Sequence, residues 1–271
     1  MTLSRGLRAT LLVVTTLALV FVYAPLGLVV LNSFNTNKSF AWPPSGLTLQ
    51  WWSAAARSEG ARGALLVSVE VALLATALSL ILGTMAALAL QRFRFFGRNS
   101  VSLLILLPIA LPGIVTGIAL NATFSQVLGP FGISFGLFTI VVGHATFCIV
   151  VVFNNVLARL RRSSTSLEEA SADLGATTLQ TFRYVTFPMI RTALLAGALL
   201  AFGLSFDEII VTTFTAGAGT QTLPLWILDN LARPNQAPIV NVVAAIVLVL
   251  SVIPIYLSQR LAGDSAGGGR V

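Results

Sequence analysis

The sequence predicts an all-α, polytopic membrane protein with six transmembrane helices. Hydrophobic residues make up 56% of its 271 residues and charged residues only 9%, whereas an ordinary soluble domain carries about 25% charged residues. Six apolar stretches approach the roughly 20 residues that a helix needs to cross a bilayer. None of them shows the alternation of a membrane-spanning strand. A chain with so few charges has no polar shell for a soluble fold.

The six expected spans follow directly from the apolar runs. The first run comes after Arg5 and Arg8, as in a signal peptide, but it is too long for such a peptide and no A-x-A cleavage site follows. We therefore expect an uncleaved span. The expected spans run roughly from Ala9 to Leu31, Ala64 to Leu90, Val101 to Phe124, Phe135 to Leu157, Thr192 to Phe214 and Ile239 to Leu257.

The basic residues predict the orientation of these spans. If the N-terminus lies in the cytoplasm, 12 of the 16 Lys and Arg residues fall in inner segments, and only Lys38, Arg57, Arg62 and Arg233 fall outside. Short loops that are rich in Lys and Arg lie preferentially on the cytoplasmic side of the membrane. We therefore expect both termini inside, and the net charge of +7 indicates orientation rather than nucleic-acid binding.

The segments between and after the spans have their own signals. Residues 32–63 contain Trp42, Trp51 and Trp52, which suit a membrane–water interface, and residues 221–238 predict a short helix stopped by Pro234. The Gly-rich tail 263–271 is expected to be disordered. The single cysteine, Cys148, lies in an apolar run and is interpreted as a packing residue, so the sequence predicts no disulfide or metal site.

The cytoplasmic segment 158–191 predicts two short helices around a glycine. Thr165 and Ser166 precede Glu168 and Glu169 at the spacing of a capping box, and Gly175 follows at a position suited to a left-handed helix end. Thr177 or Thr178 can start a second helix, and Pro188 is expected to break it before the fifth span. The first helix has a narrow face of Ala170, Ser171 and Ala172 on which another protein can pack; a solvated helix without a partner is the alternative.

This segment resembles the EAA loop of ABC importer permeases. The family pattern E-A-A-x3-G-x9-I-x-L-P reads E-A-S-x3-G-x9-V-x-F-P from Glu169 to Pro188, with Ser171, Val185 and Phe187 as the departures. In that family the loop docks on a cytoplasmic ATPase. The resemblance therefore implies a coupling role for the following residues: Glu168, Glu169, Ala170, Ser171, Asp173, Leu174, Gly175 and Pro188.

Three further segments resemble spermidine/putrescine-type permeases: residues 107–120, 143–148 and 205–225. The resemblance covers roughly residues 60–260. It implies a single permease domain, 1–271, with the type I ABC importer permease fold, located in the inner membrane of a prokaryote. It also implies that the solute is a polyamine. Another cation, an iron complex or a small organic anion is the alternative, and a channel is disfavoured by the loop.

The same resemblance implies several partners. These are a second permease, related or identical, two copies of a cytoplasmic ATPase, an extracytoplasmic solute-binding protein and the lipid bilayer. The chain has no GxxxxGK[ST] P-loop, so ATP and Mg²⁺ are expected on the separate ATPase and no cofactor on this chain. The chain is expected to be a transport subunit rather than an enzyme.

Five residues are candidates for the solute path. Pro108 and Pro112 interrupt the third span, as in transporters that line a path with broken helices, although an ordinary kinked span is the alternative. Asp207, Glu208 and Glu70 are acids at membrane depth, where charge is costly and usually faces protein or water. The family pattern places an acid after Ser-x, which favours Asp207 over Glu208. Pairing of either acid with a basic residue of a partner subunit is the alternative.

One motif suggests enzyme chemistry. Residues 132–136 match G-x-S-x-G around Ser134, and His144 follows, so an intramembrane serine hydrolase is a remote alternative. The motif requires a strand-to-helix turn, however, and here it lies in a short connection between expected helices. A lone histidine at the edge of a span is more often a packing or hydrogen-bonding residue.

Overall fold

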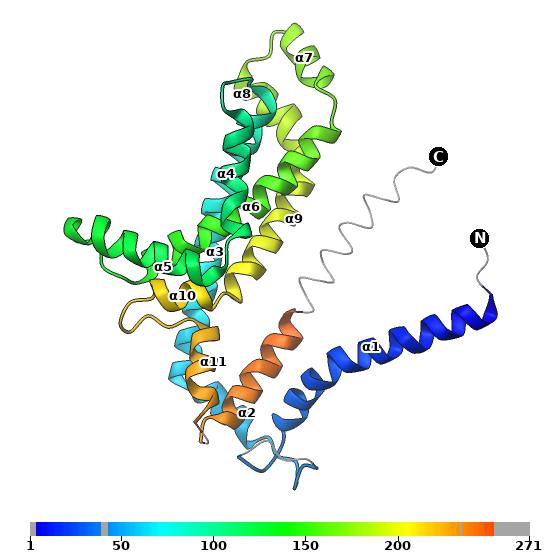
Figure 1. The fold of residues 1–271 in the computed structure, drawn as a ribbon, viewed down its shortest axis with the longest axis vertical. Coiled ribbons are helices and arrows are strands. Elements are labelled where there is room, and N and C mark those ends of the chain that lie inside the picture. The colour runs from blue at the N-terminus through cyan, green and yellow to red at the C-terminus, as the bar shows by residue number, and fades with distance from the viewer. Residues whose placement is uncertain (1–3, 39–42, 234, 252–271) are drawn as a thin grey trace. The chain divides into compact units, whose positions relative to one another are not determined.

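A computed structural model describes residues 4–38, 43–233 and 235–251 (Figure 1). Within these residues the secondary structure is helical, apart from an isolated bridge between Asn35 and Leu47. The described residues form two compact units. One lies within residues 4–62 and 227–251, and the other comprises Gly63–Trp226.

The first unit contains a long apolar helix and a short connecting segment. Helix α1 spans Arg5–Asn32, α2 spans Gln50–Arg57, and a further helix covers Ala237–Ser251. Trp51 donates its indole N–H to the carbonyl oxygen of Asn35 at 2.9 Å, and the ring of Trp52 stacks on that of Phe34 with centroids 5.1 Å apart. These tryptophans therefore fasten α2 to the residues that follow α1. Trp42 lies outside the described residues.

The second unit contains the remaining helices. Two of them, α3 and α11, cross the boundary between the units. The elements are α3 (Glu59–Arg92), α4 (Arg98–Ala110), α5 (Gly113–Thr123), η1 (Phe124–Leu128), η2 (Gly129–Phe131), α6 (Leu137–Arg162), α7 (Ser166–Asp173), α8 (Thr178–Thr181), η3 (Phe182–Thr186), α9 (Phe187–Phe206), α10 (Ile210–Thr215) and α11 (Leu223–Leu231). The expected short helix after residue 221 is confirmed as α11, and Pro234 lies outside the described residues.

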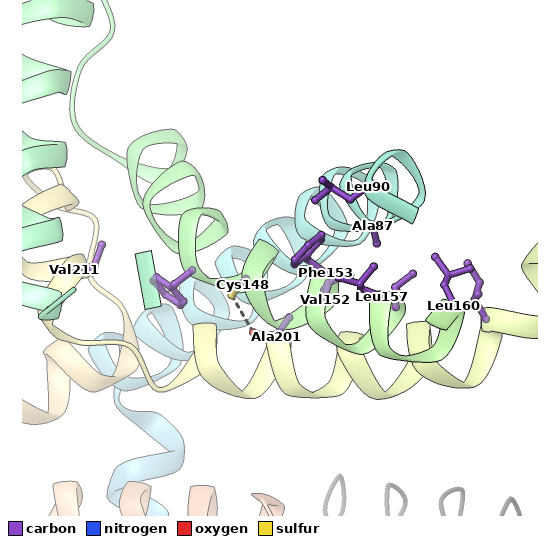
Figure 2. Close-up of a cluster of buried hydrophobic side chains, with 12 residues drawn as sticks. Ala87, Leu90, Cys148, Val152, Phe153, Leu157, Leu160, Ala201 and Val211 are labelled. Carbon is purple, nitrogen blue, oxygen red and sulfur yellow. Dashed lines mark hydrogen bonds between the residues drawn. The ribbon is translucent and has the colours of Figure 1, made fainter. Parts of the chain in front are cut away.

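Helix α6 is the centre of the second unit. It packs most extensively against α9, and its buried side chains meet Ala87 and Leu90 of α3 (Figure 2). Glycines permit these close approaches, because a Cβ on Gly83 would lie 3.0 Å from a backbone oxygen of α6 and one on Gly197 would lie 3.4 Å from its backbone. Cys148 is fully buried in this core, with its thiol 3.4 Å from the carbonyl oxygen of Ala201. Its expected packing role is confirmed.

Within the residues that the structure describes, five helical segments are long and apolar enough to cross a membrane: Arg5–Asn32, Glu59–Arg92, Gly113–Phe131, Leu137–Arg162 and Thr178–Phe206. The expected third span is broken at Leu111, where the backbone is extended and Pro112 caps α5. The expected sixth span is helical as far as residue 251, beyond which it lies outside the described residues.

The fifth span begins and ends differently from expectation. Pro188 does not break the helix, which continues from Thr178 to Phe206. The π-helical segment η3 ends two residues before Pro188. Its wider turn accommodates the proline, which lacks a backbone N–H and crowds the preceding turn of the helix. The helix also ends at Phe206 rather than Phe214, because the chain leaves it at Asp207 and starts the separate helix α10.

Candidate functional site

Two regions of the second unit bring the candidate residues together. The first is the elbow, defined as α7, the turn at Gly175 and α8, residues 166–181. At the end of α7 the N–H of Gly175 donates to the carbonyl oxygen of Ala172 at 2.8 Å, and that of Ala176 to Ser171 at 3.1 Å. Gly175 has φ +82°. This is a Schellman helix end, which requires a left-handed residue, so the expected role of Gly175 in the fold is confirmed.

The two caps of the elbow differ. Thr177 caps α8 as expected, because its hydroxyl accepts from the N–H of Gln180 and the Gln180 side chain accepts from the N–H of Thr177. The expected capping box at Thr165 is wrong. That hydroxyl makes no cap hydrogen bond, and the backbone of Thr165 is helical instead of extended. The side chain of an N-cap residue typically accepts from an N–H group of the first helical turn when the backbone of that residue is extended.

The outer face of the elbow, defined as the exposed side chains of α7 and its end, carries both leucines and acids. Leu174 is 89% exposed and Leu167 is 58% exposed, and Glu169, Ala170 and Asp173 are also exposed. Pro188 is also exposed, but it lies at the start of α9 rather than on α7. Large apolar side chains on a surface indicate a contact with protein or membrane.

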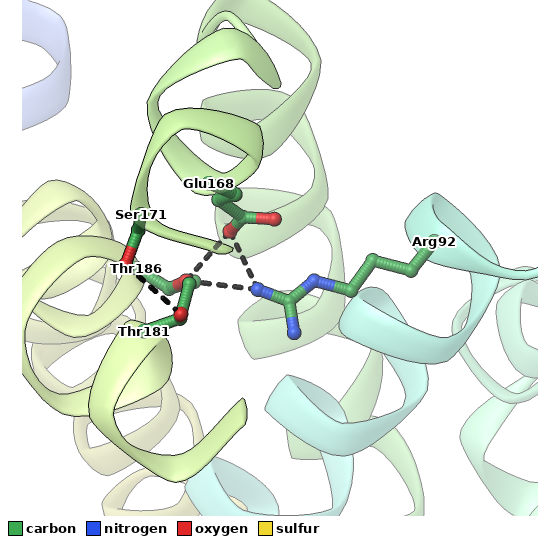
Figure 3. A network of polar contacts seen from close by, with 5 residues as sticks. All are labelled: Arg92, Glu168, Ser171, Thr181 and Thr186. Atoms are coloured by element: carbon green, nitrogen blue, oxygen red, sulfur yellow. Dashed lines mark hydrogen bonds and ion pairs between the residues drawn. The ribbon is translucent and has the colours of Figure 1, made fainter. Parts of the chain in front are cut away.

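The inner face of the elbow carries a polar network (Figure 3). Glu168 turns inward, and one of its carboxylate oxygens accepts from Arg92 at 2.5 Å and from the hydroxyl of Thr186 at 2.6 Å. Ser171 lies 3.1 Å from the hydroxyl of Thr181. The sequence did not predict the role of Arg92, because it precedes Glu168 by 76 residues and no motif links the two.

The second region surrounds the break between α9 and α10, residues 207–209. A carboxylate oxygen of Glu208 accepts from the N–H of Val211 at 2.9 Å and so caps α10. On the two sides of the break, Ser205 and Thr212 place their hydroxyls 2.8 Å from the two ring nitrogens of His144. His144 is fully buried. A single imidazole therefore connects α6 to both ends of the broken helix.

A cleft opens beside this break. Its volume is about 150 Å³, and it is lined by Pro108, Ile109, Leu111, Gly113, Thr116, Phe147, Leu204, Glu208 and Val211. The fold therefore brings the break in the third span and the acid after the fifth into one site. Among the described residues, Glu208 is the only charged one in this lining. Broken helices that flank a solute site are common in transporters.

The other path candidates lie outside this lining. Asp207 is exposed at the end of α9, and Glu70 is exposed on α3. Pro112 stands between two lining residues but does not itself line the cleft. Among the described residues, no three His, Cys, Asp or Glu side chains gather in a group that can hold a metal ion.

The hydrolase alternative has no support in this geometry. Ser134 is exposed and precedes α6 in a connection between helices, not in a strand-to-helix turn. His144 engages Ser205 and Thr212 through its two ring nitrogens. A serine nucleophile needs a histidine within hydrogen-bonding reach, and here the histidine is committed to a structural role.

The chain is similar to several known transport proteins. It is 35% identical to the putrescine transport system permease protein PotI of Escherichia coli strain K12, covering 92% of this chain and 90% of that protein. It is 33% identical to the spermidine/putrescine transport system permease protein PotC of Haemophilus influenzae, covering 89% and 91%. The fold matches the crystal structure of a bacterial ABC transporter involved in the import of the acidic polysaccharide alginate, with a TM-score of 0.69 and 18% identity over 97% of this chain and 99% of that one.

The family model also covers most of the chain. Residues 79–263 match the description "Binding-protein-dependent transport system inner membrane component". Such a family implies a partner permease, an ATPase and a binding protein. This polytopic, all-helical chain therefore belongs to the binding-protein-dependent transport system inner membrane components and is a permease subunit of an ABC importer, not an enzyme.

Proposed function

We propose that this permease imports an aliphatic polyamine, with putrescine or spermidine as the reference solutes. The observation that carries the proposal is the position of Glu208, whose carboxylate is the only charge that the described part of the chain contributes to the lining of the cleft. The two relatives named for putrescine and spermidine/putrescine transport support the same solute class.

The lining matches the chemistry of an alkylammonium group. Most of it is apolar, including Phe147 and Leu204, and can contact methylene groups. The Glu208 carboxylate can accept a hydrogen bond from an ammonium group held in the cleft. Hydrogen bonds to charged groups contribute about 1.5–3 kcal/mol, which offsets part of the lost hydration. One water requires roughly 10–15 Å³ of such space, so this cleft admits a small solute group.

The elbow is the proposed site of energy coupling. Its exposed leucines and acids, including Leu174 and Glu169, form the surface that docks on the ATPase. We expect two ATPase copies, a second and related permease and an extracytoplasmic binding protein in the complex. The excess of Arg on the same side as the elbow supports a cytoplasmic elbow and cytoplasmic termini.

Uptake of labelled putrescine by the complete complex in vesicles tests the solute path. Glu208→Gln removes the charge but keeps an oxygen that can accept from Val211, so α10 keeps its cap. We expect it to lower uptake at least tenfold while the complex assembles and hydrolyses ATP. Glu59→Gln, the same change at an acid of the other unit, should leave uptake unchanged.

Asp207→Asn separates the two candidate acids. If the family pattern identifies the acid that binds the solute, Asp207→Asn lowers uptake more than Glu208→Gln. If the lining of the cleft identifies it, Glu208→Gln lowers uptake more. Wild-type uptake in both variants would refute the cation path. Loss of uptake only through loss of the partner permease would show that these acids pair with a partner subunit instead.

A further inference from the structure

Three side chains from distant parts of the sequence close a ring at the base of the elbow (Figure 3). Arg92 is the last residue of α3, Glu168 lies in the first turn of α7, and Thr186 ends η3. The guanidinium nitrogen Nη2 of Arg92 donates to Glu168 at 2.5 Å and to Thr186 at 2.8 Å. The Thr186 hydroxyl donates in turn to the same Glu168 oxygen at 2.6 Å. Each member therefore contacts the other two.

The ring is partly protected from water and suits the helix ends. Thr186 is fully buried, and the side chains of Arg92 and Glu168 are only 28% and 19% exposed. A cation at the end of a helix and an anion in the first turn of another are both favoured by the helix dipole. Hydrogen bonds between ionised groups are roughly twice as strong as neutral ones. This network therefore differs from an ion pair on an open surface, which contributes little.

The π-helical segment η3 helps to place Thr186. Each residue of an α-helix turns the chain by about 100°, so the extra residue of a π turn changes which side of the helix a side chain faces. The same irregular turn that accommodates Pro188 thus presents Thr186 to Glu168. Single π turns inside long helices are often found at functional sites.

The ring connects α7 to two spans at once. Helix α7 packs against α8 and η3, which lead into α9, and Ser171 and Thr181 add a hydrogen bond on that side. Arg92 extends the connection to α3. A displacement of α7 is therefore transmitted both along α9 and across to α3.

We propose that Arg92, Glu168 and Thr186 form a latch that makes the coupling helix α7 move as one body with the bases of α3 and α9. The inference rests on the proposed docking of α7 on the ATPase. In this assignment Glu168 binds other residues of the permease, and the exposed side chains of α7 contact the ATPase. Arg92 and Thr186 are positioning residues for transport, because they act through α7 and touch neither the solute nor ATP.

The test measures solute transported per ATP hydrolysed by the complete reconstituted complex. Arg92→Met and Thr186→Val should lower this ratio at least fivefold, while ATPase co-purification stays within about twofold of wild type and hydrolysis persists. Arg94→Met, the same change two residues further along, should leave the ratio unchanged. Thr186→Ser keeps the hydroxyl and should retain at least half of the wild-type ratio.

A charge reversal provides a second restoration. In the double variant Arg92→Glu with Glu168→Arg, the Thr186 hydroxyl can still donate to the carboxylate and accept from the guanidinium. We expect each single reversal to uncouple the complex and the double reversal to recover at least half of the ratio. Hydrogen exchange at the α7 amides should quicken at least threefold in Thr186→Val and stay unchanged in Arg94→Met.

Two outcomes would overturn the latch. One is a wild-type ratio in both Arg92→Met and Thr186→Val. The other is loss of the ATPase from these variants with no change in the ratio for the complexes that remain, which would make the ring part of the docking surface. If the wild-type chain itself does not bind an ATPase through α7, the proposed coupling role fails, and the hydrogen-exchange comparison still tests the latch separately.

Discussion

Substitution of Gly175 tests how far the elbow depends on one backbone conformation. Gly175 has φ +82°, and a Cβ added there would meet no atom within 4 Å. The cost of Gly175→Ala is therefore conformational rather than steric. An L-residue in the left-handed region costs roughly 1–2 kcal/mol, which corresponds to about a 5- to 30-fold change in the equilibrium between the closed and open helix end.

The measurement is hydrogen exchange at the amide of Ala176, which donates to Ser171 in the closed helix end. We expect Gly175→Ala to speed this exchange about 5- to 30-fold and Gly175→Val to speed it more, because β-branched residues fit positive φ poorly. Gly175→Asn should have a smaller effect, since asparagine tolerates this region.

Gly203→Ala is the matched control. It makes the same chemical change within α9, where a Cβ also meets nothing within 4 Å and φ is not positive. We expect Gly203→Ala to leave the exchange rate of the Ala176 amide unchanged.

Gly175→Val should also insert normally into the membrane and lose the ATP hydrolysis that the binding protein stimulates. Equal exchange rates in wild type, Gly175→Ala and Gly175→Val would refute the reasoning about this helix end.

Three further predictions concern packing, polar satisfaction and orientation. Gly117→Ala places a Cβ 2.5 Å from the ring of Phe214, so we expect a loss of about 1–3 kcal/mol, seen as a lower thermal midpoint of the purified complex; an unchanged midpoint would show that the ring moves aside freely. His144→Leu leaves the Ser205 hydroxyl without its partner, at about 1–3 kcal/mol for the unsatisfied group, whereas Thr212 keeps its hydrogen bond to the carbonyl oxygen of Glu208; a midpoint equal to wild type would contradict this. In a Cys148→Ala background, Asp173→Cys should react with an impermeant maleimide only from the cytoplasmic side, and labelling from outside would reverse the topology.

Apolar runs and motif spacing were sufficient to predict most helices. The boundaries of α1, α3 and α6 agree with the expected spans within about five residues, because burial in a bilayer requires a long apolar stretch. The elbow was also predictable, since Gly175 and Thr177 act through local backbone geometry. Local signals of this kind are present in the sequence itself.

The errors arose where tertiary contacts decide the outcome. Pro188 predicted a helix end, but η3 absorbs it, and no sequence signal distinguishes a break from a π turn. The fifth span was expected to reach Phe214, yet His144 bonds both sides of a break after Phe206. The contact between Arg92 and Glu168 depends on how α3 and α7 meet, which neither local pattern contains.

The two candidate acids of the solute path are likewise distinguished by tertiary structure, and the choice between them stays a prediction. The family pattern favoured Asp207, but a sequence pattern does not show which of two adjacent acids lines a cleft. Residues on adjacent helical positions differ by about 100° in direction, and here the chain also leaves the helix between them. Only the packing of α10 against α5 and α6 shows that Glu208 lines the cleft while Asp207 is exposed.

Transport by the complete complex in sealed vesicles tests the central claim most directly. The permease pair and its ATPase are reconstituted with ATP on the side of the elbow, and the binding protein with labelled putrescine is added on the other side. The account predicts ATP-dependent accumulation that falls at least tenfold in Glu208→Gln and persists in Glu59→Gln. It is contradicted if putrescine and spermidine accumulate no faster than in vesicles without ATP while the same complex imports a solute that lacks an ammonium group.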